Sequence, residues 1–181
     1  GDASLPILLF VGRLVGYKGL DVLLRALPGL RARTVIVGDG PRRAELEGLA
    51  ADLGLGDHVQ FVGRASDADL LAWYHACDAF VLPSTSRQEA FGMVQIEAMV
   101  CGKPVVSTAI PAVKPFADVV GWTQTREEFL TATERALVDA ADPQKREARR
   151  AVARRFTWDA VAEHQLELFR QALATHPRGG A

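Results

Sequence analysis

The chain has 181 residues, of which 49% are hydrophobic and 24% are charged, and its formal net charge is −1. This composition is typical of a globular protein and excludes a disordered, collagenous or coiled-coil chain. The length predicts one domain. A nucleic-acid-binding protein usually carries a basic excess, so the balanced charge argues against a nucleic-acid partner.

The two cysteines and the ends of the chain indicate where the protein works. Cys77 and Cys101 lack the CxxC spacing of a zinc site, and we expect buried thiols in a reducing compartment. No run of 18 apolar residues is present, and Gly1–Ser4 do not open a signal peptide. We therefore expect a cytoplasmic protein. Because the first residue is not Met, we expect a processed or excised piece.

Short apolar runs alternate with amphipathic stretches along the chain. Apolar runs predict strands over 6–11, 34–37, 58–62, 79–82 and 104–107, with a short sixth strand over 118–120. Apolar residues at helical spacing predict helices over 20–27, 41–53, 66–74, 91–101, 126–141 and 143–174, the last with a break at Thr157.

This alternation predicts an α/β fold, with a doubly wound, mostly parallel sheet of about six strands covered by helices on both faces. Residues 1–181 are expected to form a single Rossmann-like domain, with 143–175 as a helical C-terminal extension. In such a sheet the ligand binds at the carboxyl ends of the strands, near the point where the strand order reverses. Binding residues are thus expected in the loops after the strands: 12–18, 38–43, 63–69, 83–92 and 108–111.

The loop after the first strand combines glycines with cations. Gly12 and Gly16 allow close approach of the backbone, and Arg13 and Lys18 supply positive charge, an arrangement that suits a diphosphate. The alternative is an ordinary turn with solvated cations. The next loop, Gly38-Asp39-Gly40, is a weak signal that favours a simple turn.

The most informative segment runs from Ser86 to Met99. Glu89 precedes the predicted helix over 91–101, and Glu97 lies inside it. Because that helix is apolar nearly all round, we expect it to be buried, so that Glu97 needs hydrogen-bond donors such as ligand hydroxyls. Gly92 lets an anion approach the free N–H groups of the helix start. The alternative is that a buried Arg satisfies Glu97 and that Glu89 only caps the helix.

Two further patterns have simpler interpretations. Asp67-Ala68-Asp69 resembles a metal-binding DxD, but it follows Ser66 in the first turn of a predicted helix, where acids favour the helix dipole. The cations between Lys145 and Arg155 recur at helical spacing, which favours a solvated face. The alternative is peripheral contact with an anionic membrane surface, on the inner membrane face, through Arg146, Arg149, Arg150 and Arg154.

Residues 5–108 resemble the C-terminal, donor-binding half of retaining glycosyltransferases of the group 1 (family 4) type, which have two Rossmann-like domains in the GT-B architecture. Glu89 and Glu97 correspond to the E-x7-E pair of that family. The matching pieces follow in order: Val11-Gly12-Arg13-Leu14 with Lys18-Gly19, Val37-Gly38-Asp39-Gly40-Pro41, Val62-Gly63-Arg64, Pro83-Ser84, Glu89-Ala90-Phe91-Gly92, Glu97-Ala98-Met99 and Gly102-Lys103-Pro104-Val105-Val106.

The resemblance implies roles for individual residues. Arg13 and Lys18 would contact the donor diphosphate, Glu89 would hold sugar hydroxyls, and Glu97 would hold ribose hydroxyls. The remaining binding residues would meet the sugar and phosphate (Ala90, Phe91 and Gly92), pack beside the ribose (Val94), lie beside the nucleobase (Gly63 and Arg64) or line the pocket (Gly12, Gly38 and Gly40).

The implied reaction moves a hexose from a UDP- or GDP-linked donor to an acceptor hydroxyl, with no cofactor and no metal required. The N-terminal acceptor-binding domain of that family is missing from this chain, so we expect little transfer by the chain alone. The stretch 109–122 is shorter than the Gly-rich segment of the family, which affects the sugar-side wall of the pocket. Two alternatives are a non-catalytic or engineered nucleotide-binding module and half of a sugar-nucleotide epimerase.

Overall fold

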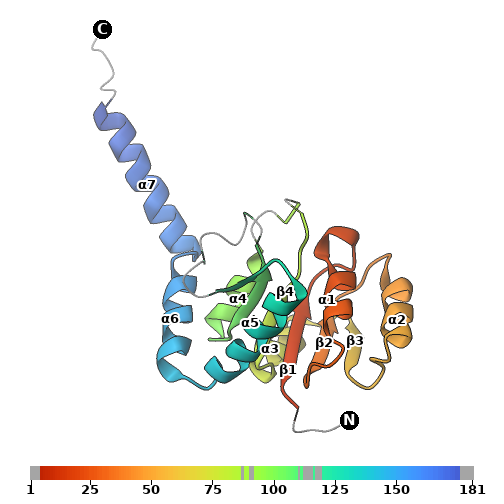
Figure 1. Cartoon of the computed structure of the whole chain (residues 1–181). Coiled ribbons are helices and arrows are strands. Elements are labelled where there is room, and N and C mark those ends of the chain that lie inside the picture. The colour runs from red at the N-terminus through yellow and green to blue at the C-terminus, as the bar shows by residue number, and fades with distance from the viewer. Residues whose placement is uncertain are drawn as a thin grey trace.

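The computed structural model describes residues 5–86, 88–89, 92–109, 111, 116 and 120–175. A central sheet is covered by helices on both faces, and the last helix extends away from it (Figure 1). The strands are β1 (Ile7–Val11), β2 (Arg33–Val37), β3 (Val59–Gly63), β4 (Ala79–Leu82), β5 (Val105–Thr108) and β6 (Val120–Thr123). The helices are η1 (Gly16–Lys18), α1 (Leu20–Ala26), α2 (Arg43–Asp52), α3 (Asp67–Ala76), α4 (Met93–Val100), α5 (Arg126–Asp139), α6 (Pro143–Arg154) and α7 (Trp158–Thr175).

The six described strands form one parallel sheet in the order β3-β2-β1-β4-β5-β6. Leu9 of β1 pairs with Val35 of β2 on one side and with Phe80 of β4 on the other. The order reverses between β1 and β4, so the loops after these two strands diverge there. The predicted doubly wound parallel sheet is confirmed, and the reversal point locates the expected ligand site.

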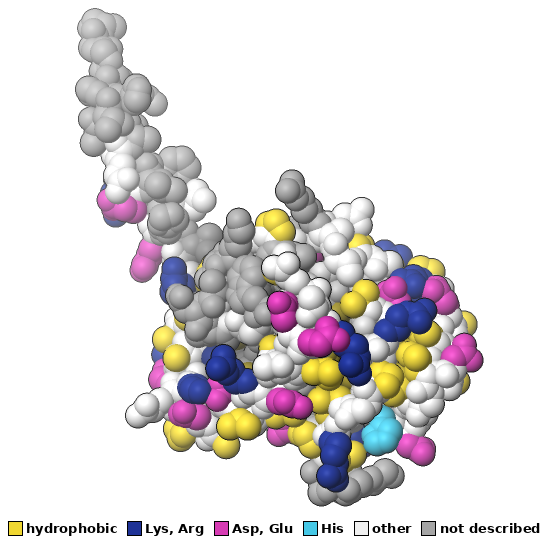
Figure 2. Space-filling view, viewed as in Figure 1, with side chains coloured by type: hydrophobic (Ala, Val, Ile, Leu, Met, Phe, Trp, Pro, Cys, Tyr) yellow, Lys and Arg dark blue, Asp and Glu magenta, His cyan; other side chains and the backbone are white. Residues whose placement is uncertain are grey.

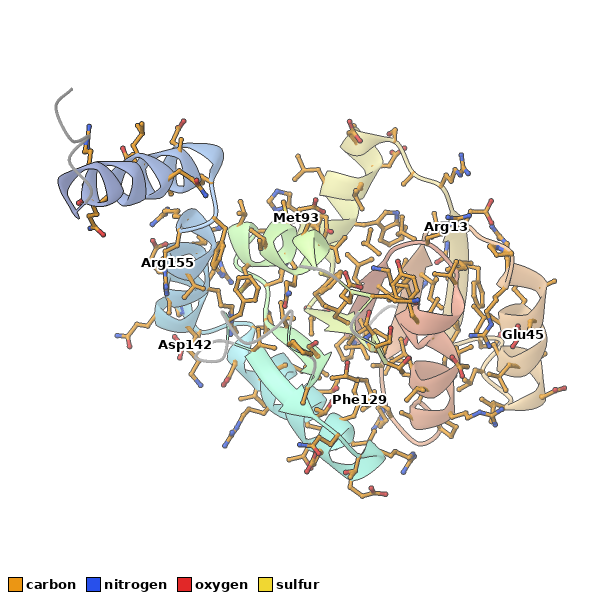
Figure 3. All side chains as sticks on the ribbon, turned by 90° about the horizontal axis from the view of Figure 1, so that it is seen from above. Arg13, Glu45, Met93, Phe129, Asp142 and Arg155 are labelled. Atoms are coloured by element: carbon orange, nitrogen blue, oxygen red, sulfur yellow. The ribbon has the colours of Figure 1, made fainter. Side chains whose placement is uncertain are left out.

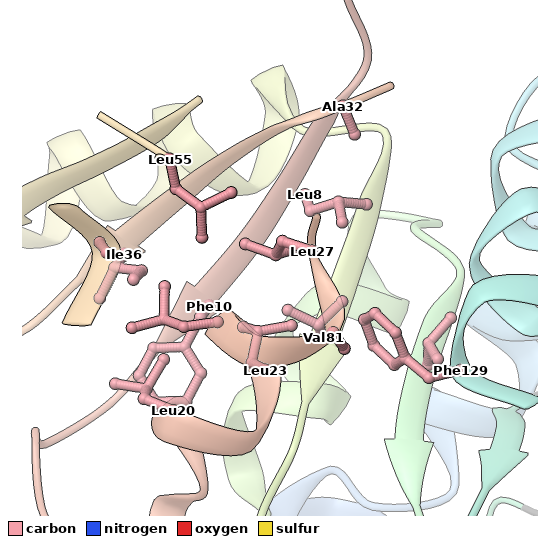
Figure 4. Packing of buried hydrophobic residues seen from close by; sticks show 14 of the residues in the cluster. Leu8, Phe10, Leu20, Leu23, Leu27, Ala32, Ile36, Leu55, Val81 and Phe129 are labelled. Carbon is pink, nitrogen blue, oxygen red and sulfur yellow. The ribbon is translucent and has the colours of Figure 1, made fainter. Parts of the chain in front are cut away.

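Alternate residues of the central strands pack on opposite faces of the sheet. Leu8 and Phe10 face α1, α2 and α5, where they form a cluster with Leu23 and Phe129 (Figure 4). Full burial of each such side chain contributes roughly 1.5–3 kcal/mol. This packing fixes β1, and so it fixes where the loop after β1 begins.

The other face of the sheet is covered by α3, α4 and α6. Leu9 and Phe80 pack there with Tyr74 of α3 and Met99 of α4. Cys77 at the end of α3 is buried as expected, and its burial raises the pKa of the thiol to about 12, whereas Cys101 is only half-buried. Tyr74 and α4 are thereby held against each other on this face of the sheet.

The sixth strand extends further along the chain than predicted. It spans Val120–Thr123 instead of 118–120, and residues 118–119 lie outside the described part of the chain. The parallel register with β5 places Val120 opposite Val105 and Thr123 opposite Thr108. The strand therefore extends through polar Thr123, whose hydroxyl donates to the Ser107 carbonyl at 3.2 Å. The pairing with β5 is a long-range contact, so the local apolar pattern did not predict that the strand includes Thr123.

The basic cluster of α6 is partly internal, which corrects the expectation of a solvated or membrane-facing surface for Arg149. Arg149 is 4% exposed, and it donates to the Gly102 carbonyl at 3.0 Å and the Asp139 carbonyl at 3.1 Å. Burial lowers the pKa of its guanidinium. Arg149 thus joins α6 to the turn after α4. Elsewhere on the surface seen in Figure 2, Lys and Arg side chains are interspersed with Asp and Glu.

Helices α3 and α6 begin where capping residues in the sequence predict. The Ser66 hydroxyl accepts a hydrogen bond from the Asp69 N–H at 3.2 Å, so Asp67 and Asp69 belong to a capped helix start as expected. Asp142 caps α6 in the same way, and α6 ends before Thr157. Within the described residues, no helix combines the length and the apolar character needed to span a membrane.

Candidate functional site at the carboxyl edge of the sheet

A groove of about 610 Å³ opens where β1, β2 and β3 end. This volume lies in the range of small-molecule sites, roughly 300–1,000 Å³. The loops after these three strands supply its walls, and its lining includes two arginines and one aspartate. The lining residues are Val11, Gly12, Arg13, Val37, Gly38, Asp39, Gly40, Arg64, Ala65 and Leu70. Arg13 and Arg64 are exposed, so their charges are available to a ligand.

Two glycines bring the first two loops into direct backbone contact. A Cβ at Gly38, whose φ is +135°, would lie 1.9 Å from the Gly12 carbonyl oxygen, and one at Gly40 would lie 2.5 Å from the Leu14 carbonyl oxygen. These positions therefore have no room for a side chain. The Gly38-Asp39-Gly40 signal, which by itself favours a simple turn, marks a close approach that shapes the groove.

Lys18 and Glu89 form a buried ion pair at the point where the loops after β1 and β4 diverge. Lys18 Nζ lies 2.6 Å from Glu89 Oε2, and the two side chains are 11% and 8% exposed. The Ser84 hydroxyl donates to the same Oε2 at 2.9 Å. The Lys18 chain also passes beside Gly12, because a Cβ there would lie 3.6 Å from Lys18 Cε. The pair therefore lies next to the lining of the groove.

This arrangement excludes the alternative that Glu89 only caps a helix. Helix α4 begins at Met93 after Gly92, and no side chain caps it. Both donors that the described residues offer to Glu89 reach Oε2. Oε1 can accept a further donor, such as a sugar hydroxyl, and the Lys18 ammonium has two further protons to donate.

Glu97 is the residue whose environment differs most from expectation. It is exposed, not buried, because Met93, Glu97 and Val100 form the solvent stripe of α4. Two of these three residues are apolar, which makes the sequence resemble a fully buried helix. Glu97 Oε2 accepts a hydrogen bond of 2.6 Å from the hydroxyl of Tyr74, a tyrosine rather than the arginine of the alternative interpretation.

The predicted binding residues lie on one edge of the sheet but in three sets. Gly12, Arg13, Gly38, Gly40 and Arg64 line the groove, and Gly63 ends β3 beside it. Lys18 of the loop after β1 pairs with Glu89 of the loop after β4, and α4 carries Val94 and Glu97 after Gly92. Ala90 and Phe91 lie outside the described residues. Figure 3 shows Arg13 and Met93 on one side of the sheet and Phe129 on the other.

Two residues that contact the predicted carboxylates were not among the predicted site residues. Ser84 and Tyr74 provide hydroxyl donors to Glu89 and Glu97. Tyrosine is common in helices, so Tyr74 was not distinguishable before its partner was known. Ser84 lies two residues after the end of the buried β4, and Pro83-Ser84 is one of the pieces that carry the family resemblance. Among the described residues, no three His, Cys, Asp or Glu side chains gather as metal ligands do.

Known proteins resemble this chain over most of its length. The model of the family described as Glycosyl transferases group 1 matches residues 2–139. The D-inositol 3-phosphate glycosyltransferase of Salinispora tropica is 33% identical over 94% of this chain and 39% of its own length.

Two solved structures superpose on most of the chain. Sucrose-phosphate synthase from Thermosynechococcus elongatus matches with a TM-score of 0.77 and 33% identity, over 96% of this chain and 47% of its own. HepE from Anabaena, solved with UDP and glucose, matches with a TM-score of 0.75 and 26% identity, over 93% of this chain and 49% of its own. The chain thus spans less than half the length of these relatives. It belongs to the group 1 glycosyl transferases.

Proposed function

We propose that the chain binds the nucleoside diphosphate of a sugar donor at the carboxyl edge of its sheet. The observation that carries this proposal is the juxtaposition of the Lys18–Glu89 pair with a glycine-lined groove that holds Arg13 and Arg64. The UDP and glucose held by HepE of Anabaena support a ligand of this class. A UDP- or GDP-linked hexose is the proposed donor.

Each part of such a donor has a chemically suitable partner. Arg13 and the free protons of Lys18 suit the diphosphate, and the N–H groups at the start of α4 would favour the same negative charge. Glu89 Oε1 suits sugar hydroxyls, and Glu97 suits ribose hydroxyls. The backbone near Gly63 and the Arg64 side chain would lie beside the nucleobase. A diphosphate lying between the groove and α4 would join the three sets of residues.

The longer relatives suggest how this binding serves a reaction. We propose that the chain is one donor-binding unit, with 143–175 as a helical extension, and that it transfers a hexose when joined to an N-terminal acceptor-binding part. Negative charge grows on the departing nucleoside diphosphate, and fixed cations stabilise it. By analogy with the loss of an oxyanion-hole donor, loss of Lys18 would slow transfer by about 10²–10³.

Calorimetric titration of the chain with UDP, GDP and ADP tests the binding proposal. We expect weak, saturable binding of at least one of them, and at least about tenfold weaker binding after Arg13→Ala or Glu97→Ala, because each change removes a charged hydrogen-bonding partner. Both side chains are exposed, and thermal unfolding of each variant checks the fold, because Glu97→Ala also removes the acceptor of the buried Tyr74 hydroxyl.

The matched control is Arg154→Ala, which removes an exposed cation of α6 that pairs with Glu147. It should leave the affinity unchanged. Binding of none of the three nucleotides would favour the non-catalytic module instead. Equal affinity of Arg13→Ala, Glu97→Ala and the unaltered chain would place the site elsewhere.

A further inference from the structure

Tyr74 lies where α3 meets α4, and its hydroxyl is in contact with Glu97. The residue is 3% exposed, and its ring packs beside Phe80 with 5.9 Å between the ring centroids. The hydroxyl lies 2.6 Å from Glu97 Oε2 and 3.3 Å from the Val94 carbonyl oxygen. The buried ring of Tyr74 thus holds its hydroxyl against the exposed carboxylate of Glu97.

A hydroxyl has one proton, and these distances decide where it goes. The shorter contact is to a carboxylate, and hydrogen bonds to a charged acceptor are shorter and stronger than those to a neutral carbonyl. Burial raises the pKa of the Tyr74 phenol, and the hydrogen bond to Glu97 raises it further, so the phenol keeps its proton. Tyr74 is therefore a permanent donor to Glu97.

An exposed glutamate on a helix otherwise samples several rotamers, and ordering it on ligand binding costs conformational entropy. With Oε2 anchored by the phenol, the side chain is ordered before a ligand arrives, and Oε1 can accept from an incoming hydroxyl. Glu97 is the carboxylate to which the proposed function assigns the ribose.

We propose that Tyr74 is a positioning residue that pre-orders Glu97 for the ribose hydroxyls and so sets the preference of the site for a ribonucleotide. The inference rests on the proposed function. The proposed function assigns no role to Tyr74, which is buried and does not touch the nucleotide itself. The inference gives Tyr74 a measurable effect, which is the discrimination between a ribose and a sugar that lacks both hydroxyls.

Tyr74→Phe tests this role, because it keeps the ring beside Phe80 and removes only the hydroxyl. The affinities for whichever nucleoside diphosphate binds best and for its 2′,3′-dideoxy form are measured by calorimetry. In the unaltered chain we expect the ribose form to bind about tenfold or more tightly than the dideoxy form. In Tyr74→Phe this ratio should fall several-fold, with the dideoxy affinity unchanged.

Two controls separate positioning from a general structural effect. Thr133→Val removes another fully buried hydroxyl, in α5 on the opposite face of the sheet, and should leave the ratio unchanged. In a Glu97→Ala background, adding Tyr74→Phe should cost little further affinity, because the acceptor that Tyr74 orders is already gone. Thermal unfolding of each variant reports whether the fold is retained.

If Tyr74→Phe does not fold, the unaltered chain gives the answer by NMR with ¹³C-labelled tyrosine. The Tyr74 signal should shift with the ribose form more than with the dideoxy form, and equal shifts would overturn the role. An unchanged ratio in a folded Tyr74→Phe, or an equal loss of affinity for both forms, would also overturn it while leaving the proposed function intact. Failure of the unaltered chain to bind any of the nucleotides would overturn both.

Discussion

Replacing Lys18 with Met is expected to lower the free energy of unfolding by about 3–5 kcal/mol, the usual result of removing one partner from a buried ion pair. Glu89 would be left 8% exposed, with only the Ser84 hydroxyl among its described donors. A carboxylate in that position must either stay charged without its cation or take up a proton. Urea unfolding followed by circular dichroism measures the loss.

The double variant Lys18→Met with Glu89→Gln separates the contribution of the ion pair to stability from its contribution to nucleotide binding. It removes both charges while Ser84 can still hydrogen-bond the amide, so most of the lost stability should return. Nucleoside diphosphate binding should not return, because the cation remains absent. Recovery of binding along with stability would mean that Lys18 serves the fold alone, and equal instability of the single and double variants would refute the ion-pair argument.

Gly38→Ala is expected to destabilise the chain by about 2–6 kcal/mol, which combines a strained positive φ with overpacking. The new Cβ would lie 1.9 Å from the Gly12 carbonyl oxygen, and neither backbone segment can move without deforming the groove. Nucleotide binding should be lost in parallel. The midpoint of urea unfolding and a titration of the folded fraction measure the two effects.

The matched control is Gly48→Ala, in the middle of α2, where an added Cβ meets nothing within 4 Å. This change should stabilise the chain by about 0.5–1 kcal/mol, because alanine loses less conformational freedom in a helix. If Gly38→Ala instead matched Gly48→Ala in stability, the close contact between the first two loops would not exist in solution.

Much of the fold could be predicted because its signals are local. The apolar run over 79–82 becomes β4, and Ser66 caps α3 where the sequence indicated. The sixth strand could not be placed as well, because its extent depends on pairing with β5 rather than on its own residues. Likewise, the sequence pattern predicted a surface position for Arg149, because its hydrogen bonds to the Gly102 and Asp139 carbonyls depend on the tertiary fold.

The sequence predicted a groove at this edge of the sheet, but it did not predict the contacts within the candidate site. A parallel sheet places the loops after its strands at one edge. At the reversal of strand order this edge brings Lys18 to Glu89, which are 71 residues apart in the sequence. The burial assigned to Glu97 was wrong, because Met93 and Val100 expose apolar surface beside it. What holds that carboxylate is Tyr74, a residue whose role depends entirely on how α3 packs against α4.

A crystal structure of the chain with a bound nucleoside diphosphate tests the central claim most directly. The expected result is a pyrophosphate within hydrogen-bond distance of Arg13 and Lys18, with the ribose hydroxyls on Glu97. The structure holds a second hollow of about 540 Å³ between α5 and the amino ends of β5 and β6, lined by Glu127, Arg135 and Arg149 among others. A nucleotide found there, with the glycine-lined groove empty, would contradict the proposed site.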